Sequence, residues 1–537
     1  MQITDFKGSV LNLMQDLVLT IDCGTQGMRA LIFDRTGALL SKTEKAFDGY
    51  YTKKPGYVEA PPDMFWEALK CVVGELKTKS PRLFAKLGGM TLAAQRDIAT
   101  VTDRQGRALR DFISWMDRRT LDQALPIPNP YRTAFNLAGK KAFVDSFNRG
   151  THAHWIKVHE PELWQRADLY IFLSTYLTSR LIGRVVEAKS AIAGHFPYDF
   201  KKKKWCGPWA IKRQIIQIER EKLCELVDSC EIMGYVTAEA AAETGLPEGL
   251  PFVGSGTDKG CETLGVGCVS PEVASVSLGT QATVEVTSRR YYELVPFYPP
   301  FPAVDPRAYN PEITVYHGMW MVGWFLDTFA EKEREDCLVR GEDIYSFLDH
   351  KLAGIPAGAE GLLLQPYWGQ ESFKPEAAGS IIGFGGHHTK YHIYRSVIEG
   401  LGFALREGLE TIEKKSGVAV KIIGLSGGGA QSDVIAQIMA DIFNRPVYRV
   451  QTSETTGLGG AMAVCVGLGI YSDLSEARDA MVRKSAVFDP GVQNAAFYNA
   501  LYNNVYKRAY KRYKPLYKAL KGLNNRNNKE EGEINEQ

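Results

Sequence analysis

Two short segments of this chain join an apolar strand to the same Gly-Thr-Gln turn. The first reads Val18-Leu-Thr-Ile-Asp22-Cys-Gly24-Thr25-Gln26, and the second reads Val276-Ser-Leu-Gly279-Thr280-Gln281. Another apolar run follows each turn, so both segments predict a strand, a tight turn and a return strand. Glycine allows the close backbone approach of such a turn, and the backbone N–H groups of the turn can point at an anion. One copy alone is more often an ordinary hairpin, but the pair indicates two similar domains with two phosphate-binding hairpins.

Charged residues flank the first hairpin. Asp22 ends its first strand, where a carboxylate can hold Mg²⁺, because Mg²⁺ prefers a few carboxylates together with phosphate oxygens and water. Arg29 lies on the return strand, from which its guanidinium could reach a phosphate. The alternative for Arg29 is a solvated charge on the surface of the strand.

Asp258 is the candidate for acid–base chemistry. It lies in Gly254-Ser-Gly256-Thr-Asp258, directly after an apolar strand that we expect over 250–255. A carboxylate at such a loop tip can accept the proton of a substrate hydroxyl while a phosphoryl group is transferred. The alternative is an aspartate that only forms a turn.

A glycine-rich segment, Gly427-Gly428-Gly429-Ala430-Gln431, follows an expected strand over 422–425 and opens an expected helix over 432–443. The backbone there can approach a flat or anionic ligand closely, and a helix N-terminus favours negative charge. The segment is neither G-x-G-x-x-G nor a Walker loop. It indicates a nucleotide site of another kind.

Two segments combine an aromatic face with charged hydrogen-bonding groups, as polyols and sugars require. They are Gln95-Arg96-Asp97 and Trp115-Met-Asp117-Arg118. The alternative is a surface charge cluster beside a core tryptophan. His387, His388 and His392 have no matching metal-ligand spacing, so we predict no zinc site there.

Length and composition favour a multidomain globular enzyme. The chain has 537 residues, of which 45% are hydrophobic and 23% charged, with a net charge of +2. These values give no reason to expect binding to nucleic acid or a membrane. Nine isolated cysteines, no run long enough to span a bilayer and a segment 1–16 unlike a signal peptide lead us to expect a cytoplasmic protein.

The apolar periodicity predicts alternating strands and helices. The segment 291–311, rich in proline and tyrosine, is predicted as a loop or insertion. Strands are expected over 17–22, 30–34, 39–45, 91–94 and 100–102, and helices over 63–77, 153–158, 163–182, 209–230, 322–333, 343–352 and 391–415.

These motifs together resemble the FGGY carbohydrate kinases, a family that includes glycerol kinase and xylulokinase. The resemblance covers roughly residues 17–500 in family order. It is carried by Asp22-Cys-Gly24-Thr25 with Arg29, Gln95-Arg96-Asp97, Trp115-Met-Asp117-Arg118, Gly256-Thr-Asp258, Leu278-Gly279-Thr280, and Gly427-Gly-Gly429-Ala-Gln431-Ser with Ala440-Asp441 and Arg445-Pro446.

The resemblance implies an α/β protein of two actin-like (ribonuclease H-like) domains around an interdomain cleft. The sugar or polyol half would span 17–265 and the ATP half 266–520, before a disordered polar tail over 521–537. By the same resemblance Asp258 is the catalytic base, and Asp22 holds the metal. Arg96, Asp97 and Trp115 bind the acceptor, whereas ATP and its phosphates are bound by Thr25, Arg29, Gly279, Thr280, Gly428, Gly429 and Gln431.

Departures from the family pattern leave the acceptor open. Glycerol kinases carry Arg-Glu where this chain has Arg96-Asp97, and xylulokinases usually carry Met-His. Lys259 replaces the Gln or Asn that usually follows the base, and it could contact a ketose oxygen, an acidic sugar or Asp258. Phe147 is the nearest candidate for the acceptor-contacting tyrosine of glycerol kinase.

The function expected from the resemblance is transfer of phosphate from ATP, with Mg²⁺, to a terminal hydroxyl of a small sugar or polyol. The alternatives are an actin-like nucleotide-binding scaffold and a catalytically weak sugar sensor. A helix expected over 401–412 could pack inside the fold or form a homodimer, and the sequence leaves both open.

Overall fold

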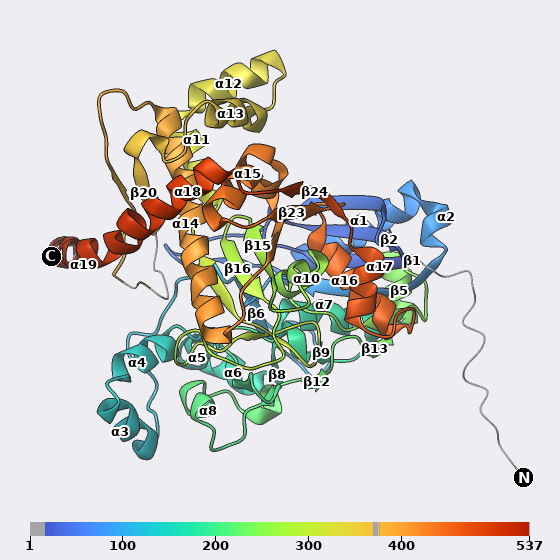
Figure 1. The fold of residues 1–537 in the computed structure, drawn as a ribbon. Coiled ribbons are helices and arrows are strands. Elements are labelled where there is room, and N and C mark those ends of the chain that lie inside the picture. The colour runs from blue at the N-terminus through green and yellow to red at the C-terminus, as the bar shows by residue number, and fades with distance from the viewer. Residues whose placement is uncertain (1–16, 369–373, 375, 536–537) are drawn as a thin grey trace, which may run out of the picture.

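The computed structural model describes residues 17–368, 374 and 376–535, with side chains described as far as residue 523. The segment 1–16, which we expect not to be a signal peptide, lies outside the described residues. Two six-stranded sheets organise the chain, one in residues 17–265 and one from residue 266 onward, and we call these parts the N-terminal and C-terminal halves (Figure 1).

The two sheets repeat the same spatial arrangement of strands, with one difference in connection: the sixth strand precedes the fifth in the chain of the N-terminal half and follows it in the C-terminal half. In the N-terminal half the strand order is β3 (Leu39–Ala46), β2 (Gly27–Asp34), β1 (Leu17–Cys23), β5 (Leu87–Ala94), β14 (Pro251–Val253) and β13 (Ile232–Tyr235). In the C-terminal half it is β19 (Glu312–Val315), β16 (Ala282–Val286), β15 (Val273–Leu278), β22 (Ile422–Ser426), β23 (Val447–Val450) and β24 (Lys484–Phe488).

Strand directions repeat as well as strand order. In both sheets the first three strands are antiparallel, the third, fourth and fifth are parallel, and the sixth is antiparallel. Both Gly-Thr-Gln segments connect the third strand to the second, as predicted. The repeat that the two motifs indicate is therefore confirmed at the level of whole sheets.

The halves differ in what is inserted into this frame. In the N-terminal half, residues 95–250 lie between β5 and β14 and contain β13 together with three strands of a small sheet. That sheet has the order β4 (Glu59–Ala60), β7 (Phe112–Ile113), β6 (Ala99–Thr102) and β8 (Leu169–Phe172), and its strand β4 comes earlier in the chain, between β3 and α1. Its helices are α1 (Pro62–Lys79), α2 (Pro81–Phe84), α3 (Asn129–Leu137), α4 (Lys141–Arg149), α5 (His152–His159), α6 (Pro161–Arg166), α7 (Leu173–Ile182), α8 (Ile211–Ile215), α9 (Ala238–Thr244) and α10 (Asp258–Gly265).

The C-terminal half inserts helices between β19 and β22 instead. The long helix α14 (Lys390–Ser416) packs on β16 and β19 and on the helix that follows β22. The helices of this half are α11 (Trp320–Phe329), α12 (Glu331–Arg340), α13 (Ile344–Ala353), α14, α15 (Asp433–Phe443), α16 (Thr455–Gly467), α17 (Leu474–Met481), α18 (Val492–Leu501) and α19 (Lys507–Asn535).

Two sequence expectations are wrong in detail. The helix expected over 163–182 is broken into α6, β8 and α7, because Leu169–Phe172 pairs with β6. The helix expected over 209–230 shrinks to α8, and Glu225–Val227 forms β12, which pairs with β9 (Val186–Ala188). Neither pairing is visible to helical periodicity, since each partner strand is distant in the sequence. The polar tail expected from residue 521 follows on from α19, whose bounds reach Asn535, and its disorder stays a prediction.

Helices α10 and α16 pack closely where the two halves meet (Figure 1). Each follows the fifth strand of its sheet, so they are equivalent elements of the repeat. A Cβ on Gly265 would lie 1.9 Å from the carbonyl oxygen of Thr455, and one on Gly459 would lie 1.9 Å from that of Cys261. One glycine on each helix therefore permits the close approach that joins the halves.

None of the helices in the described part of the chain combines the length and apolar character needed to cross a bilayer.

Candidate active site

The carboxyl ends of β1, β5 and β14 gather three predicted motifs at one edge of the N-terminal sheet. Asp22 pairs with Ala93 in parallel register, and Ala94 forms a bridge to Thr257. Parallel strands end on the same side of a sheet, so Asp22, Arg96 and Asp258 project from adjacent positions. Segments about 70 and 160 residues apart in sequence are thus brought to one edge, where ligands bind in open α/β sheets.

Asp22 is almost fully buried and forms an ion pair with Arg29, whose Nη1 lies 3.1 Å from Asp22 Oδ2. The pKa of Asp22 is raised to about 7, chiefly by burial; Arg29 opposes this shift, and the charges of Asp258 and Glu454 add to it. Arg29 also lies 3.7 Å from Glu454, which comes from the C-terminal half. The Arg29 side chain remains 46% exposed, and it joins carboxylates from both halves.

Thr25 is connected to the acceptor motifs. Trp115 donates its indole N–H to Thr25 Oγ1 and to Gln95 Oε1, both at 3.1 Å. Gln95 in turn donates to the carbonyl oxygen of Gly24 and to the Tyr50 hydroxyl. The first hairpin and Trp115 are therefore joined through Gln95 in one hydrogen-bonded unit.

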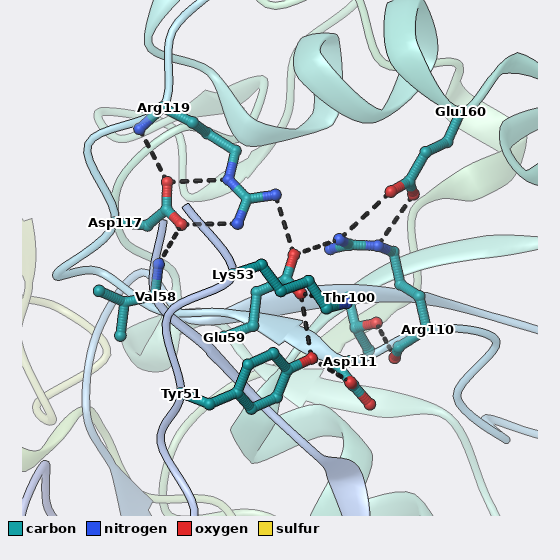
Figure 2. A network of polar contacts seen from close by, with 10 residues as sticks. All are labelled: Tyr51, Lys53, Val58, Glu59, Thr100, Arg110, Asp111, Asp117, Arg119 and Glu160. Atoms are coloured by element: carbon teal, nitrogen blue, oxygen red, sulfur yellow. Dashed lines mark hydrogen bonds and ion pairs between the residues drawn. The ribbon is translucent and has the colours of Figure 1, made fainter. Parts of the chain in front are cut away.

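A buried charge network involves Asp117 and Arg119, which follow Trp115 in the sequence (Figure 2). Asp117 and Arg119 form a bidentate ion pair with side chains fully inaccessible to solvent, and Arg119 also lies 2.9 Å from Glu59. The Arg119 guanidinium lies over the rings of Tyr57 and Trp155, at 4.2 and 4.5 Å from their centroids. The Trp115-Met-Asp117 segment is thus anchored by internal ion pairs and is not the surface charge cluster of the alternative interpretation.

Arg96 crosses from the N-terminal to the C-terminal half. Its Nε donates to Thr257 Oγ1 at 3.2 Å, beside Asp258, and its Nη1 lies 2.7 Å from Glu312 on β19. The Phe301 ring stacks on the guanidinium at 4.1 Å. Phe301 belongs to the 291–311 segment, which is largely irregular apart from β17 (Phe301–Pro302) and β18 (Tyr309–Asn310) and so agrees with the predicted loop.

Asp97 adopts a left-handed backbone conformation with φ of 57°. Its Oδ2 lies 3.0 Å from His195 Nδ1, and a Cβ on Gly194 would lie 2.1 Å from Asp97 Oδ1, so glycine is needed there. Burial raises the pKa of Asp97, but the His195 contact outweighs it and holds that pKa well below its usual range. Phe147 stacks against His195 with ring centroids 4.6 Å apart, which places it on the side predicted for the acceptor.

Asp258 is the first residue of α10, whose N-cap is Thr257. Burial raises the pKa of Asp258, and the charges of Arg96 and Lys259 oppose that shift. Lys259 Nζ lies 2.7 Å from both Glu262 Oε2 and Ser277 Oγ, the latter on β15. Lys259 is therefore held between the halves, close to the charge of Asp258, and its contact with the acceptor stays a prediction.

The predicted nucleotide motifs of the C-terminal half are adjacent. Gly427 has φ of 82°, and a Cβ there would lie 2.9 Å from the amide nitrogen of Gly279. Space is open around Gly428, whereas a Cβ on Gly429 would lie 2.8 Å from Met319 Cε. Gln431 lines a hollow of about 270 Å³ together with Leu425, Ser426, Arg449, Val450, Gln451, Thr452, Ser453, Thr455 and Ser485.

Thr280 is exposed at its turn, and the carbonyl oxygens of Gly279 and Thr280 accept hydrogen bonds from the amides of Met319 and Trp320 at the start of α11. The second Gly-Thr hairpin and the glycine-rich segment thus lie together, as the nucleotide hypothesis requires.

Comparison with known families decides the identity of this fold. The model of the FGGY family of carbohydrate kinases, N-terminal domain, matches residues 17–265, and the C-terminal domain model of the same family matches residues 274–468. The chain belongs to the FGGY family of carbohydrate kinases. It is a carbohydrate kinase with two α/β domains of the actin-like type, and its family uses ATP as the phosphoryl donor.

Individual relatives match this kinase over nearly its whole length. Xylulose kinase from Lactococcus lactis subsp. lactis (strain IL1403) is 29% identical over 489 residues, which cover 90% of this chain and 94% of the relative. The solved gluconate kinase from Lactobacillus acidophilus superposes with a TM-score of 0.79 at 21% identity, covering 94% and 99% of the two chains. Xylulose kinase from Rhodospirillum rubrum gives 0.78 at 23% identity, covering 93% and 99%.

The structure adds residues that the sequence motifs of this kinase do not single out. His195 holds Asp97, Glu312 and Phe301 hold Arg96, and Glu454 contacts Arg29. Each lies about 100 residues or more from its partner in the sequence, so no local spacing could have indicated the contact. Gln95 is the exception, because it stands directly before Arg96.

Proposed function

We propose that this kinase transfers the γ-phosphoryl group of ATP to a terminal hydroxyl of a small sugar or polyol, with Asp258 as the base. The observation that carries the proposal is the position of Asp258. It starts α10 beside Thr257 and Arg96, and Lys259 next to it reaches β15 of the C-terminal half. A carboxylate at this junction can meet an acceptor held by the N-terminal half and a nucleotide held by the C-terminal half.

The acceptor would be bound by Arg96, Asp97 and Trp115. The two charged side chains can hydrogen-bond hydroxyls, and the indole offers an apolar face. His195 keeps Asp97 ionised, so this carboxylate acts as a hydrogen-bond acceptor. Asp258 would orient the reacting hydroxyl and take its proton as the oxygen attacks the γ-phosphorus.

The phosphates of ATP would be bound by both hairpins. Backbone N–H groups at Thr25, Gly279 and Thr280 can donate to phosphate oxygens, and Arg29 adds positive charge near Asp22. The adenosine would lie against Gly428, Gly429 and Gln431, beside the hollow described above. Exclusion of water by these packed groups would prevent hydrolysis of ATP in place of transfer.

Magnesium fits this arrangement through Asp22. In the part of the chain that the structure describes, no three His, Cys, Asp or Glu side chains form a set that could hold a metal alone. This agrees with Mg²⁺ chemistry, since that ion takes few carboxylates together with phosphate oxygens and water. Bound there, Mg²⁺ would neutralise charge on the β- and γ-phosphates.

An ATP-to-ADP assay over an acceptor panel tests the proposal. The panel comprises glycerol, erythritol, D- and L-ribulose, D- and L-xylulose, L-fuculose, L-rhamnulose and gluconate. We expect one acceptor to raise turnover well above the rate without sugar. Tight ATP binding with a flat panel would instead favour the nucleotide-binding scaffold or the sugar sensor.

A further inference from the structure

The C-terminal half presents a polar face toward the proposed acceptor site. In the antiparallel pair β16–β19, Thr283 faces Thr314 and Glu285 faces Glu312, and alternate residues of a strand share one side of the sheet. Glu312 reaches Arg96 in the other half. We call Thr283, Glu285 and Glu312 the acidic wall.

Among the residues that the structure describes, three buried polar atoms around this wall find no hydrogen-bond partner. They are Nη2 of Arg96, Oγ1 of Thr283 and Oε2 of Glu285. Glu285 and Thr283 are only 1% and 2% exposed. Leaving a buried donor or acceptor without a partner costs much more than a typical hydrogen bond gains, so a cluster of three indicates a group that fills these positions.

The chemistry of the missing group follows from these three atoms. Arg96 can only donate, whereas Thr283 can donate and accept. A sugar hydroxyl also does both, so a polyol chain can serve a guanidinium and a carboxyl at once. A carboxylate group on the ligand can only accept hydrogen bonds. It would also be repelled by the negative charges of Glu312 and Asp258, because the positive charge of Arg96 is already paired with Glu312.

We propose that the acidic wall is a second part of the acceptor site and that it selects a neutral, polyhydroxylated acceptor over a sugar acid. The inference rests on the proposed function. It assigns to the C-terminal half a role in acceptor choice, with Phe301 covering the Arg96 guanidinium from the same half. Burial and the neighbouring Glu312 carboxyl raise the pKa of Glu285, which lets its protonated form donate to a hydroxyl.

The test compares isosteric variants by two readouts. Acceptor binding is measured by calorimetry without ATP, and KM values for acceptor and ATP are measured in the coupled assay, with D-xylulose, glycerol and D-gluconate as probes. The variants are Thr283→Val, Glu285→Gln and Glu312→Gln. The matched control is Thr287→Val, a buried threonine just past the end of β16 whose hydroxyl donates to the Cys268 carbonyl.

We expect Thr283→Val and Glu285→Gln to weaken binding of the best neutral acceptor about 3- to 10-fold each, the range of a lost hydrogen bond. The KM for ATP and the Thr287→Val control should stay at wild-type values. The wild-type protein should bind D-gluconate more weakly than the best neutral acceptor. In Glu312→Gln the difference between these two affinities should be smaller, because one negative charge is removed.

Several results would overturn the inference. They are D-gluconate as the preferred acceptor, no binding of any neutral probe, or acceptor affinities of Thr283→Val and Glu285→Gln equal to that of the control. If a neutral acceptor binds and Thr283→Val weakens that binding without any turnover, the inference stands and the proposed transfer reaction fails. Failure of the two proposals is therefore distinguishable.

Discussion

The hairpins β1–β2 and β15–β16 occupy the same place in their sheets but carry different chemistry. The last register pair before the turn is Cys23–Met28 in one and Leu278–Ala282 in the other. One residue earlier the first hairpin has Asp22 opposite Arg29, whereas the second has Ser277 opposite Thr283. A charged pair in the N-terminal half thus corresponds to two hydroxyls in the C-terminal half.

The helices that follow the fifth strands differ in the same way. Helix α10 begins with Asp258, and α16 begins with Thr455 after Glu454. The Glu454 carboxylate forms ion pairs with Lys42 and Arg29, which both belong to the other half. Two sheets of the same strand arrangement therefore carry different groups: the proposed base and metal ligand in the N-terminal half, and the proposed glycine-rich nucleotide loops in the C-terminal half.

The largest effect should follow from removing the charge of Asp258. Asp258→Asn keeps the shape of the side chain but cannot accept a proton, so we expect turnover to fall by about 10²- to 10⁴-fold with ATP affinity retained. Thr455→Ser at the equivalent helix start should leave turnover close to wild type. Steady-state kinetics and nucleotide titration check both variants, and comparable turnover in Asp258→Asn would remove Asp258 from the base role.

Removing an arginine from an ion pair should lower stability more in the N-terminal half, where the pair is buried, than in the C-terminal half, where it is exposed. Arg119→Met leaves Asp117 buried without its ion pair, and we expect the free energy of unfolding to fall by about 3–5 kcal/mol. The control in the C-terminal half is Arg334→Met, whose pair with Asp327 is exposed and worth about 1 kcal/mol or less. Urea unfolding of the two variants measures the difference, and equal losses would contradict a structural role for the buried network.

The symmetry of the α10–α16 contact gives a third prediction. Gly265→Ala and Gly459→Ala should each lower the free energy of unfolding by about 1–3 kcal/mol, because each added methyl meets a carbonyl of the opposite helix. Gly74→Ala on α1 meets no neighbour and should raise stability by about 0.5–1 kcal/mol. Thermal unfolding followed by circular dichroism checks all three, and a stable Gly459→Ala variant would show that the helices can separate freely.

The smallest effect concerns the pH dependence of stability. Glu285 has an ordinary carboxyl pKa of 4.5 and a folded pKa of about 8, so between these values the unfolded chain releases a proton that the folded chain keeps. Stability therefore falls as pH rises through this interval, by at most about 1.4 kcal/mol per unit. Glu285→Gln should lose less stability than wild type between pH 6 and pH 7 in urea titrations, and parallel slopes would refute the shift.

Local patterns in the sequence already define much of the fold. The strands at 17–23, 27–34 and 39–46 and the helices α1, α13, α14 and α15 follow from alternation, helical periodicity and turn residues. The expected helices over 163–182 and 209–230 are wrong because β8 and β12 form by pairing with distant strands. Pairing energy of that kind leaves no periodic signal in the paired segment itself.

The sequence by itself determined the two Gly-Thr-Gln hairpins, the glycine-rich segment and the candidate residues Asp22, Arg96, Asp97, Trp115 and Asp258, because each depends on a short motif. Only the tertiary structure decided which groups hold those side chains. His195 on Asp97, Glu312 on Arg96 and Glu454 on Arg29 join residues about 100 to 425 positions apart. The contacts of Glu312 and Glu454 depend on how the two sheets meet, and that of His195 depends on how the chain between β5 and β14 folds back on the N-terminal half. No local spacing in the sequence records either arrangement.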